Sequence, residues 1–166
     1  MKERTRFLAA LAVSLLSAVV IGSQPPPTAA LSEALLAHVK GEQFAIVTSL
    51  RGLPLGVRNG LQTLFGSQAI DTAIAEPGAA YQSTDVIITP NLPVRRMVAA
   101  GCSVDHCLVY YERGGIAHTF QVALFRWTPA ETRFEGGGIA PGGLKTIADV
   151  RSAVLSGAIK GSPRSW

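Results

Sequence analysis

The chain has 166 residues, of which 48% are hydrophobic and 16% are charged. This length fits one domain, and the composition is too apolar for an intrinsically disordered polymer. Although the formal net charge is +4, residues 31–166 carry only 12 basic and 10 acidic side chains. This balance excludes the strongly basic surface that is typical of nucleic-acid binding, so we expect no nucleic-acid partner.

Residues 1–30 have the three-part pattern of an export leader. A basic start precedes an uncharged run from Phe7 to Gly22, and a polar segment with three prolines follows. As a helix, the uncharged run would rise about 24 Å, less than the roughly 30 Å of a bilayer core. We therefore expect a signal peptide, cleaved after Gly22 or Ala30, and an extracytoplasmic location, periplasmic or secreted. If the leader is not cleaved, it becomes a membrane anchor.

Residues 31–160 are predicted to form one α+β domain, with 161–166 as a C-terminal tail. Three segments combine helical spacing of apolar residues with capping or breaking residues at their ends. They are about 31–40 with Ser32 as N-cap, Pro54 to Gly66, and about 147–159 with Thr146 and Asp149 as a variant capping box. Two or three helices are thus expected to pack against a sheet.

The expected sheet is an antiparallel meander of about four or five strands. Its candidate strands are rich in β-branched and aromatic residues and are separated by turn signals. They are 43–50, 84–89, 94–102, 107–113, 116–127 and a short final strand at 132–135. Residues 67–82 are expected to be a loop, and the glycine-rich segment 136–143 a flexible connection.

A two-residue turn at Gly114-Gly115 would set the register of the longest hairpin. It would place Tyr111 opposite His118 and Cys107 opposite Val122. Because side chains alternate along a strand, this register puts His106 and His118 on opposite faces of the sheet. The two histidines are therefore not expected to share a site.

Cys102 and Cys107, the two cysteines of the chain, flank a short tip. An even pair of cysteines in an exported protein usually forms a disulfide. Opposed residues of antiparallel strands have Cα atoms about 4.5–5.5 Å apart, which is within reach of that bond. Asp105 and His106 would then lie in solvent. A zinc or copper site at the tip would instead need both thiolates free and another ligand from elsewhere.

The sequence contains no catalytic, dinucleotide-binding or P-loop motif, and no cofactor is expected. The leading hypothesis is a non-catalytic module that binds an unidentified protein or small ligand, with a membrane partner only if the leader is retained. Its possible binding residues are Tyr110, Tyr111, His118 and Trp127. The alternative is an extracytoplasmic hydrolase, thiol-redox enzyme or metal-binding protein that uses the Cys102–Cys107 tip or His118 with Tyr111. His38 is expected only to interact with a helix dipole.

Overall fold

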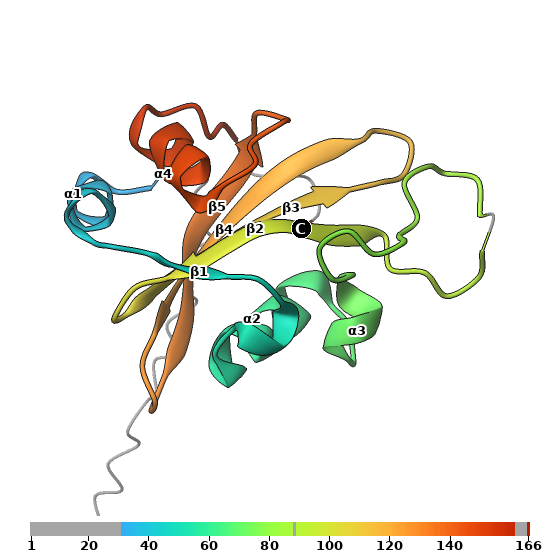
Figure 1. The fold of residues 1–166 in the computed structure, drawn as a ribbon, viewed down its shortest axis with the longest axis horizontal. Coiled ribbons are helices and arrows are strands. Elements are labelled where there is room, and N and C mark those ends of the chain that lie inside the picture. Colours follow the sequence, from blue (N-terminus) through green and yellow to red (C-terminus); the bar gives the residue numbers. More distant parts are fainter. Residues whose placement is uncertain (1–30, 88, 162–165) are drawn as a thin grey trace, which may run out of the picture.

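The computed structural model describes residues 31–87, 89–161 and 166. The expected signal peptide, 1–30, and most of the expected tail lie outside these residues. As predicted, the described part is α+β: a sheet of antiparallel strands has helices on both of its faces (Figure 1). None of the helices in the described ranges is long and apolar enough to cross a membrane.

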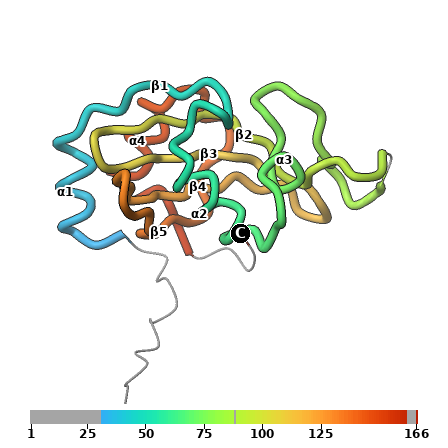
Figure 2. The backbone as a smooth tube through the Cα atoms, turned by 90° about the horizontal axis from the view of Figure 1, so that it is seen from below, coloured from blue at the N-terminus to red at the C-terminus, as the bar shows by residue number. Residues whose placement is uncertain are grey.

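The sheet is a meander, as the sequence predicted, and each strand pairs with the next one along the chain. The strands, in spatial order, are β1 (Ala45–Val47), β2 (Arg95–Cys102), β3 (His106–Arg113), β4 (Thr119–Trp127) and β5 (Thr132–Ala140). Figure 2 shows the strands side by side in this order, with α1 at one end of the sheet and the segment before β2 projecting beyond the other end.

Each face of the sheet is covered by its own pair of helices. On one face lie α1 (Glu33–Gly41) and α4 (Ile147–Leu155), and on the other lie α2 (Leu55–Phe65) and the short α3 (Ile70–Ala73), preceded by the 3₁₀ turn η1 (Leu50–Gly52). The predicted caps at the starts of α1 and α4 and the predicted end of α2 are confirmed, but α4 ends at Leu155 and not at about residue 159. Ser32 accepts a hydrogen bond from the Leu35 N–H, Thr146 and Asp149 form a reciprocal capping box, and Gly66 ends α2 with a φ of 63°.

The central strand β3 is buried on both faces because helices cover both sides of the sheet. Tyr111 belongs to the core under α2 and α3, whereas Tyr110 belongs to the core under α1 and α4. Both tyrosines are fully buried. The Tyr110 hydroxyl donates to the Pro141 carbonyl at 2.8 Å, and the Tyr111 hydroxyl donates to the Gln121 side chain at 2.7 Å.

The predicted register of the β3–β4 hairpin is wrong. Tyr111 pairs with Gln121, and Cys107 pairs with Phe125. Instead of a two-residue turn, the whole segment 114–118 connects the strands. Relative to the prediction, β4 is shifted along β3 by an odd number of residues. The side chains of β4 therefore point to the opposite faces from those predicted. Glu112 and His106 are six residues apart in β3, so their side chains point to the same face of the sheet. His118 lies beside Glu112. The two histidines are therefore on one face and not, as was predicted, on opposite faces.

Three predicted local structures also differ. The described residues of 84–89 are not in a strand, and the expected loop 67–82 contains α3. The glycine-rich segment is not a flexible connection at its start, because β5 continues through Gly137 to Ala140. A Cβ atom at Gly137 would lie 2.0 Å from the Val122 carbonyl oxygen. Glycine is therefore required here for the close approach of two strands.

Candidate metal centre

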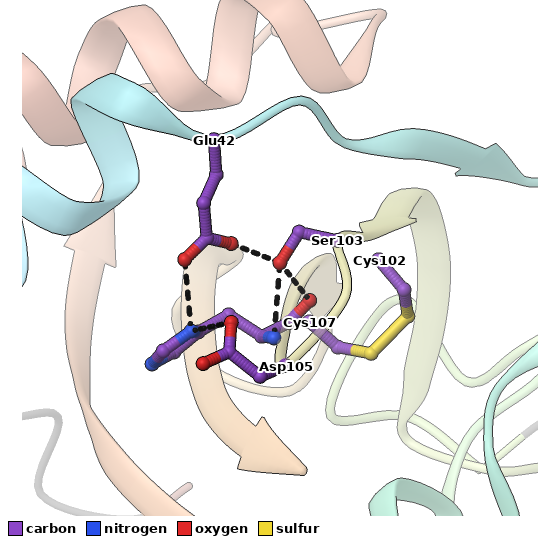
Figure 3. Close-up of a disulfide and its surroundings, with 6 residues drawn as sticks. Glu42, Cys102, Ser103, Asp105 and Cys107 are labelled. Carbon is purple, nitrogen blue, oxygen red and sulfur yellow. Dashed lines mark hydrogen bonds and ion pairs between the residues drawn. A yellow bond between two sulfur atoms is a disulfide. The ribbon is translucent and has the colours of Figure 1, made fainter. Parts of the chain in front are cut away.

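Cys102 and Cys107 form the predicted disulfide, with an S–S distance of 2.05 Å and a Cα–Cα distance of 4.1 Å. The bond joins the last residue of β2 to the second residue of β3 and closes the tip between them (Figure 3). Because each sulfur is bonded to the other, a metal site that uses both thiolates is contradicted.

Hydrogen bonds of the backbone hold the tip in one conformation. The Ser103 N–H donates to the His106 carbonyl at 2.7 Å, and the His106 N–H donates to Ser103 Oγ at 3.0 Å. The Asp105 carbonyl accepts from the N–H of Trp127, at the end of β4, at 2.8 Å. His106 is buried, with 5% of its side chain exposed. The expectation that both Asp105 and His106 lie in solvent is therefore wrong for His106.

The C-terminal end of α1 lies against this tip. His38 and Glu42 are one helical turn apart, so both can point from the same side of the helix. Glu42 is the C-cap residue, and its N–H donates to the His38 carbonyl at 3.2 Å. Arg151 of α4 donates to the carbonyls of Val39 and Lys40. These bonds fix the helix end, since its last carbonyls otherwise have no partner within the helix.

Four side chains from the two segments converge at one point: His38, Glu42, Asp105 and His106. One ligand atom from each lies within 4.8 Å of all the others. His106 Nδ1 is 3.1 Å from Glu42 Oε1 and 2.9 Å from Asp105 Oδ1. His38 Nε2 is 3.3 Å from the same Asp105 oxygen and also contacts Glu42 Oε1. The point between them is lined by two imidazole nitrogens and two carboxylate oxygens.

The electrostatics of the cluster favour a cation. Burial raises the pKa of Asp105, but hydrogen bonds with His106 and His38 outweigh it and leave this pKa below its usual value. Asp105 is thus ionised at neutral pH. Glu42 Oε2 accepts a hydrogen bond from Ser103 Oγ. Its Oε1 atom is buried and accepts no hydrogen bond of suitable geometry from the described residues, although two imidazole nitrogens lie beside it.

The donor set and spacing fit a divalent transition metal. Four ligands at about 2.0–2.1 Å from a tetrahedral zinc ion lie about 3.3 Å from one another. Three of the nitrogen–oxygen distances, 2.9, 3.1 and 3.3 Å, are close to this value, and the fourth contact, between His38 Nε2 and Glu42 Oε1, is shorter. Imidazole nitrogen suits Zn²⁺, Co²⁺, Ni²⁺ and Cu²⁺, whereas Ca²⁺ and Mg²⁺ prefer sites made of oxygen alone.

The structure does not bring the predicted pair His118 and Tyr111 together. His118 instead belongs to a second polar cluster, centred on buried Glu112. One Glu112 oxygen accepts from the Tyr81 hydroxyl at 2.7 Å and lies 2.9 Å from His118 Nε2, and the other accepts from Arg96 Nε at 2.7 Å. Both Glu112 oxygens therefore already have partners within the cluster. The hydrogen bond from Tyr81 fastens the segment that contains this residue to the sheet.

The ionisation of this second cluster follows from its contacts. Burial raises the pKa of Glu112, but hydrogen bonds with Tyr81, Arg96 and His118 outweigh it and lower this pKa below its usual value. Burial, together with the hydrogen bond to Glu112, raises the pKa of Tyr81 to about 12. The Arg96 guanidinium lies 4.5 Å from the centroid of the Tyr81 ring. The cluster therefore joins the Glu112 carboxylate to the Arg96 guanidinium and to the protonated Tyr81 hydroxyl, with His118 beside the same carboxylate.

Trp127, another predicted binding residue, lines an apolar cleft of about 660 Å³ between α2 and the β4–β5 connection. Its indole Nε1 is buried and has no hydrogen-bond partner among the described residues. The cleft lies on the opposite face of the sheet from the four converging side chains, because Trp127 packs with the core under α2 and α3.

Sequence reasoning missed His38 and Glu42 as members of a site. Their spacing places both on one side of a helix, which is a signal available in the sequence. Nothing local indicates, however, that this helix end meets a tip more than sixty residues further along the chain. Comparison of the chain with protein-family models, with curated proteins and with solved structures found no match.

Proposed function

We propose that this protein is an exported binding module whose ligand is a divalent transition-metal ion, with Zn²⁺ as the best fit. One observation carries the proposal: ligand atoms of His38, Glu42, Asp105 and His106 lie within 4.8 Å of one another, although they come from two distant segments. The disulfide beside them and the leader-like N-terminus support an extracytoplasmic, oxidising location.

The competing explanation is a network of hydrogen bonds without a metal. In such a network each protonated nitrogen would face one oxygen acceptor. Here His106 Nδ1 and His38 Nε2 both hydrogen-bond to the same Asp105 oxygen, and the buried Glu42 Oε1, which lies beside both nitrogens, accepts no well-formed hydrogen bond. A metal ion at the shared point would satisfy all four groups at once, which favours the metal site.

Direct titration tests the proposal. The protein is purified with its disulfide intact, treated with a chelator and titrated with Zn²⁺ by calorimetry and with Co²⁺ by visible absorption. We expect one ion per chain and a Co²⁺ spectrum of the tetrahedral type. His38→Gln should weaken Zn²⁺ binding by more than about tenfold, since loss of even a group that supports a ligand costs 10–100-fold. His38 is half-exposed, so its replacement should leave the fold intact.

A matched control is available in the second histidine–carboxylate pair. His118 has the same side-chain exposure, 46%, as His38 and also lies beside a carboxylate. His118→Gln should leave Zn²⁺ affinity unchanged. Equal affinities of the wild type and His38→Gln would overturn the proposal, as would a Zn²⁺ stoichiometry well below one.

A further inference from the structure

A pocket of about 340 Å³ opens beside the four candidate ligands. It is bordered by α1 and by the ends of β3, β4 and β5, and His38, Asp105 and His106 line it together with Arg126 and Arg133. A pocket of this volume falls within the range of small-molecule sites. A metal ion held by the four side chains would therefore have a neighbouring space on its more exposed side, where 46% of the His38 side chain is accessible.

The sheet register places two arginines in this pocket. Arg126 of β4 pairs with His106 of β3, and Arg133 of β5 pairs with Arg126, so the three form a row on one face of the sheet. Arg133 is already paired, because its guanidinium donates to Glu135 Oε1 at 2.6 and 2.9 Å. The Arg126 side chain is exposed and makes no hydrogen bond or ion pair with any described residue. Its guanidinium is thus available to a ligand.

The charge of the pocket depends on the metal. Asp105 lines the pocket, and Glu42, which is not a lining residue, contacts His38 and His106 next to it. Counted with neutral histidines, these two carboxylates outweigh the single positive charge of Arg126, so the metal-free pocket offers an anion no net positive charge. A divalent cation cancels both carboxylates and leaves Arg126 as a net positive charge, while Arg133 and Glu135 cancel each other. The metal-loaded pocket therefore attracts an anion, and the metal-free pocket does not.

We infer that the metal-loaded centre binds a small molecule that carries a carboxylate or phosphate group. This inference rests on the proposed metal site. One oxygen of the anion would occupy a fifth position on the metal, because zinc sites can expand to five ligands. The remaining oxygens would accept hydrogen bonds from Arg126, whose planar guanidinium matches carboxylate and phosphate geometry.

Titration of the Co²⁺-loaded protein with inorganic phosphate, and separately with acetate, tests this inference. We expect at least one of the two anions to change the visible Co²⁺ spectrum in a saturable way. If only phosphate or only acetate has this effect, that anion is the preferred one. The metal-free protein should bind neither anion in calorimetry. Arg126→Gln keeps all four metal ligands and should still load with Co²⁺, but its anion affinity should fall by at least tenfold.

The matched control is Arg51→Gln, since Arg51 is an exposed arginine in η1, outside this pocket. This variant should bind the anion as the wild type does. If Co²⁺ binds and neither anion changes its spectrum, or if Arg126→Gln retains full anion affinity, the inference is overturned while the metal site stands. If Co²⁺ does not bind at all, the proposed function and the inference fail together.

Discussion

His106 Nδ1 lies 3.1 Å from Glu42 Oε1, across the boundary between the disulfide-closed tip and the end of α1. This contact makes the candidate centre composite, because the helix and the tip supply two ligands each. Neither segment has a complete set of ligands. Binding of a metal should therefore fasten α1 to the sheet.

Zn²⁺ should stabilise the folded protein. A ligand that binds only the folded state stabilises it by about 2.7 kcal/mol when its free concentration is a hundredfold above Kd. Urea unfolding at several Zn²⁺ concentrations should show this dependence, with Kd measured separately by calorimetry. His38→Gln should lose most of the effect. A stabilisation of the same size in that variant would mean that Zn²⁺ binds elsewhere.

Removal of the disulfide should weaken metal binding more than it weakens the fold. The bond closes a very short loop, for which chain entropy predicts only about 2 kcal/mol of stability. It also holds the tip that carries Asp105 and His106. In the double variant Cys102→Ala and Cys107→Ala, we expect a folded protein with at least tenfold weaker Zn²⁺ binding. Circular dichroism checks the fold, and an unchanged Zn²⁺ affinity would show that hydrogen bonds alone fix the tip.

Glu112 should contribute to the loss of stability in acid. Its pKa is lowered in the folded state, so the unfolded state binds the proton more tightly. Its contribution is therefore complete above the ordinary value of 4.5 and disappears as the pH falls further. Glu112→Gln should cost about 1–3 kcal/mol at pH 7, because Arg96 then loses its anionic partner. Urea unfolding between pH 7 and 3 should show the two proteins converging in acid, and parallel curves would contradict this role.

Gly137→Ala should strongly destabilise the sheet. The added Cβ would lie 2.0 Å from the Val122 carbonyl oxygen, and a backbone φ of 158° is unfavourable for alanine. We expect a loss of more than about 2 kcal/mol in thermal or urea unfolding. Gly41→Ala is the matched control, because nothing lies within 4 Å of its added Cβ at the end of α1. That change should be neutral or slightly stabilising.

Features governed by neighbouring residues were predictable from the sequence. The cap at Ser32, the capping box at Thr146 and the left-handed end at Gly66 depend on hydrogen bonds within one turn of chain. The disulfide was predictable because its two cysteines are only five residues apart. The meander followed from alternating turn signals and β-rich segments.

Features governed by distant or competing interactions were not predictable in the same way. Gly114-Gly115 resembled a tight turn, but Gly114 lies directly against the Gln82 backbone, where an added Cβ would be 2.0 Å from its carbonyl oxygen. Tertiary packing thus selected a longer connection and a different register. Likewise, two ligands of the candidate centre were visible at the tip, but the meeting of the tip with α1 depends on packing against α4. No local pattern encodes that contact.

Arg151 of α4 donates hydrogen bonds to two carbonyls at the end of α1. These bonds link the first and last helices of the described chain. The β2–β5 hairpins join neighbours in sequence, so they can form early, whereas α1 docking closes the largest loop of the domain. The two ligands that α1 supplies are therefore held against the tip in part by the C-terminal helix. If the proposed export and the proposed metal site are both correct, a site that depends on residues from 38 to 151 is complete only after most of the domain has crossed the membrane, and its metal would come from the destination compartment.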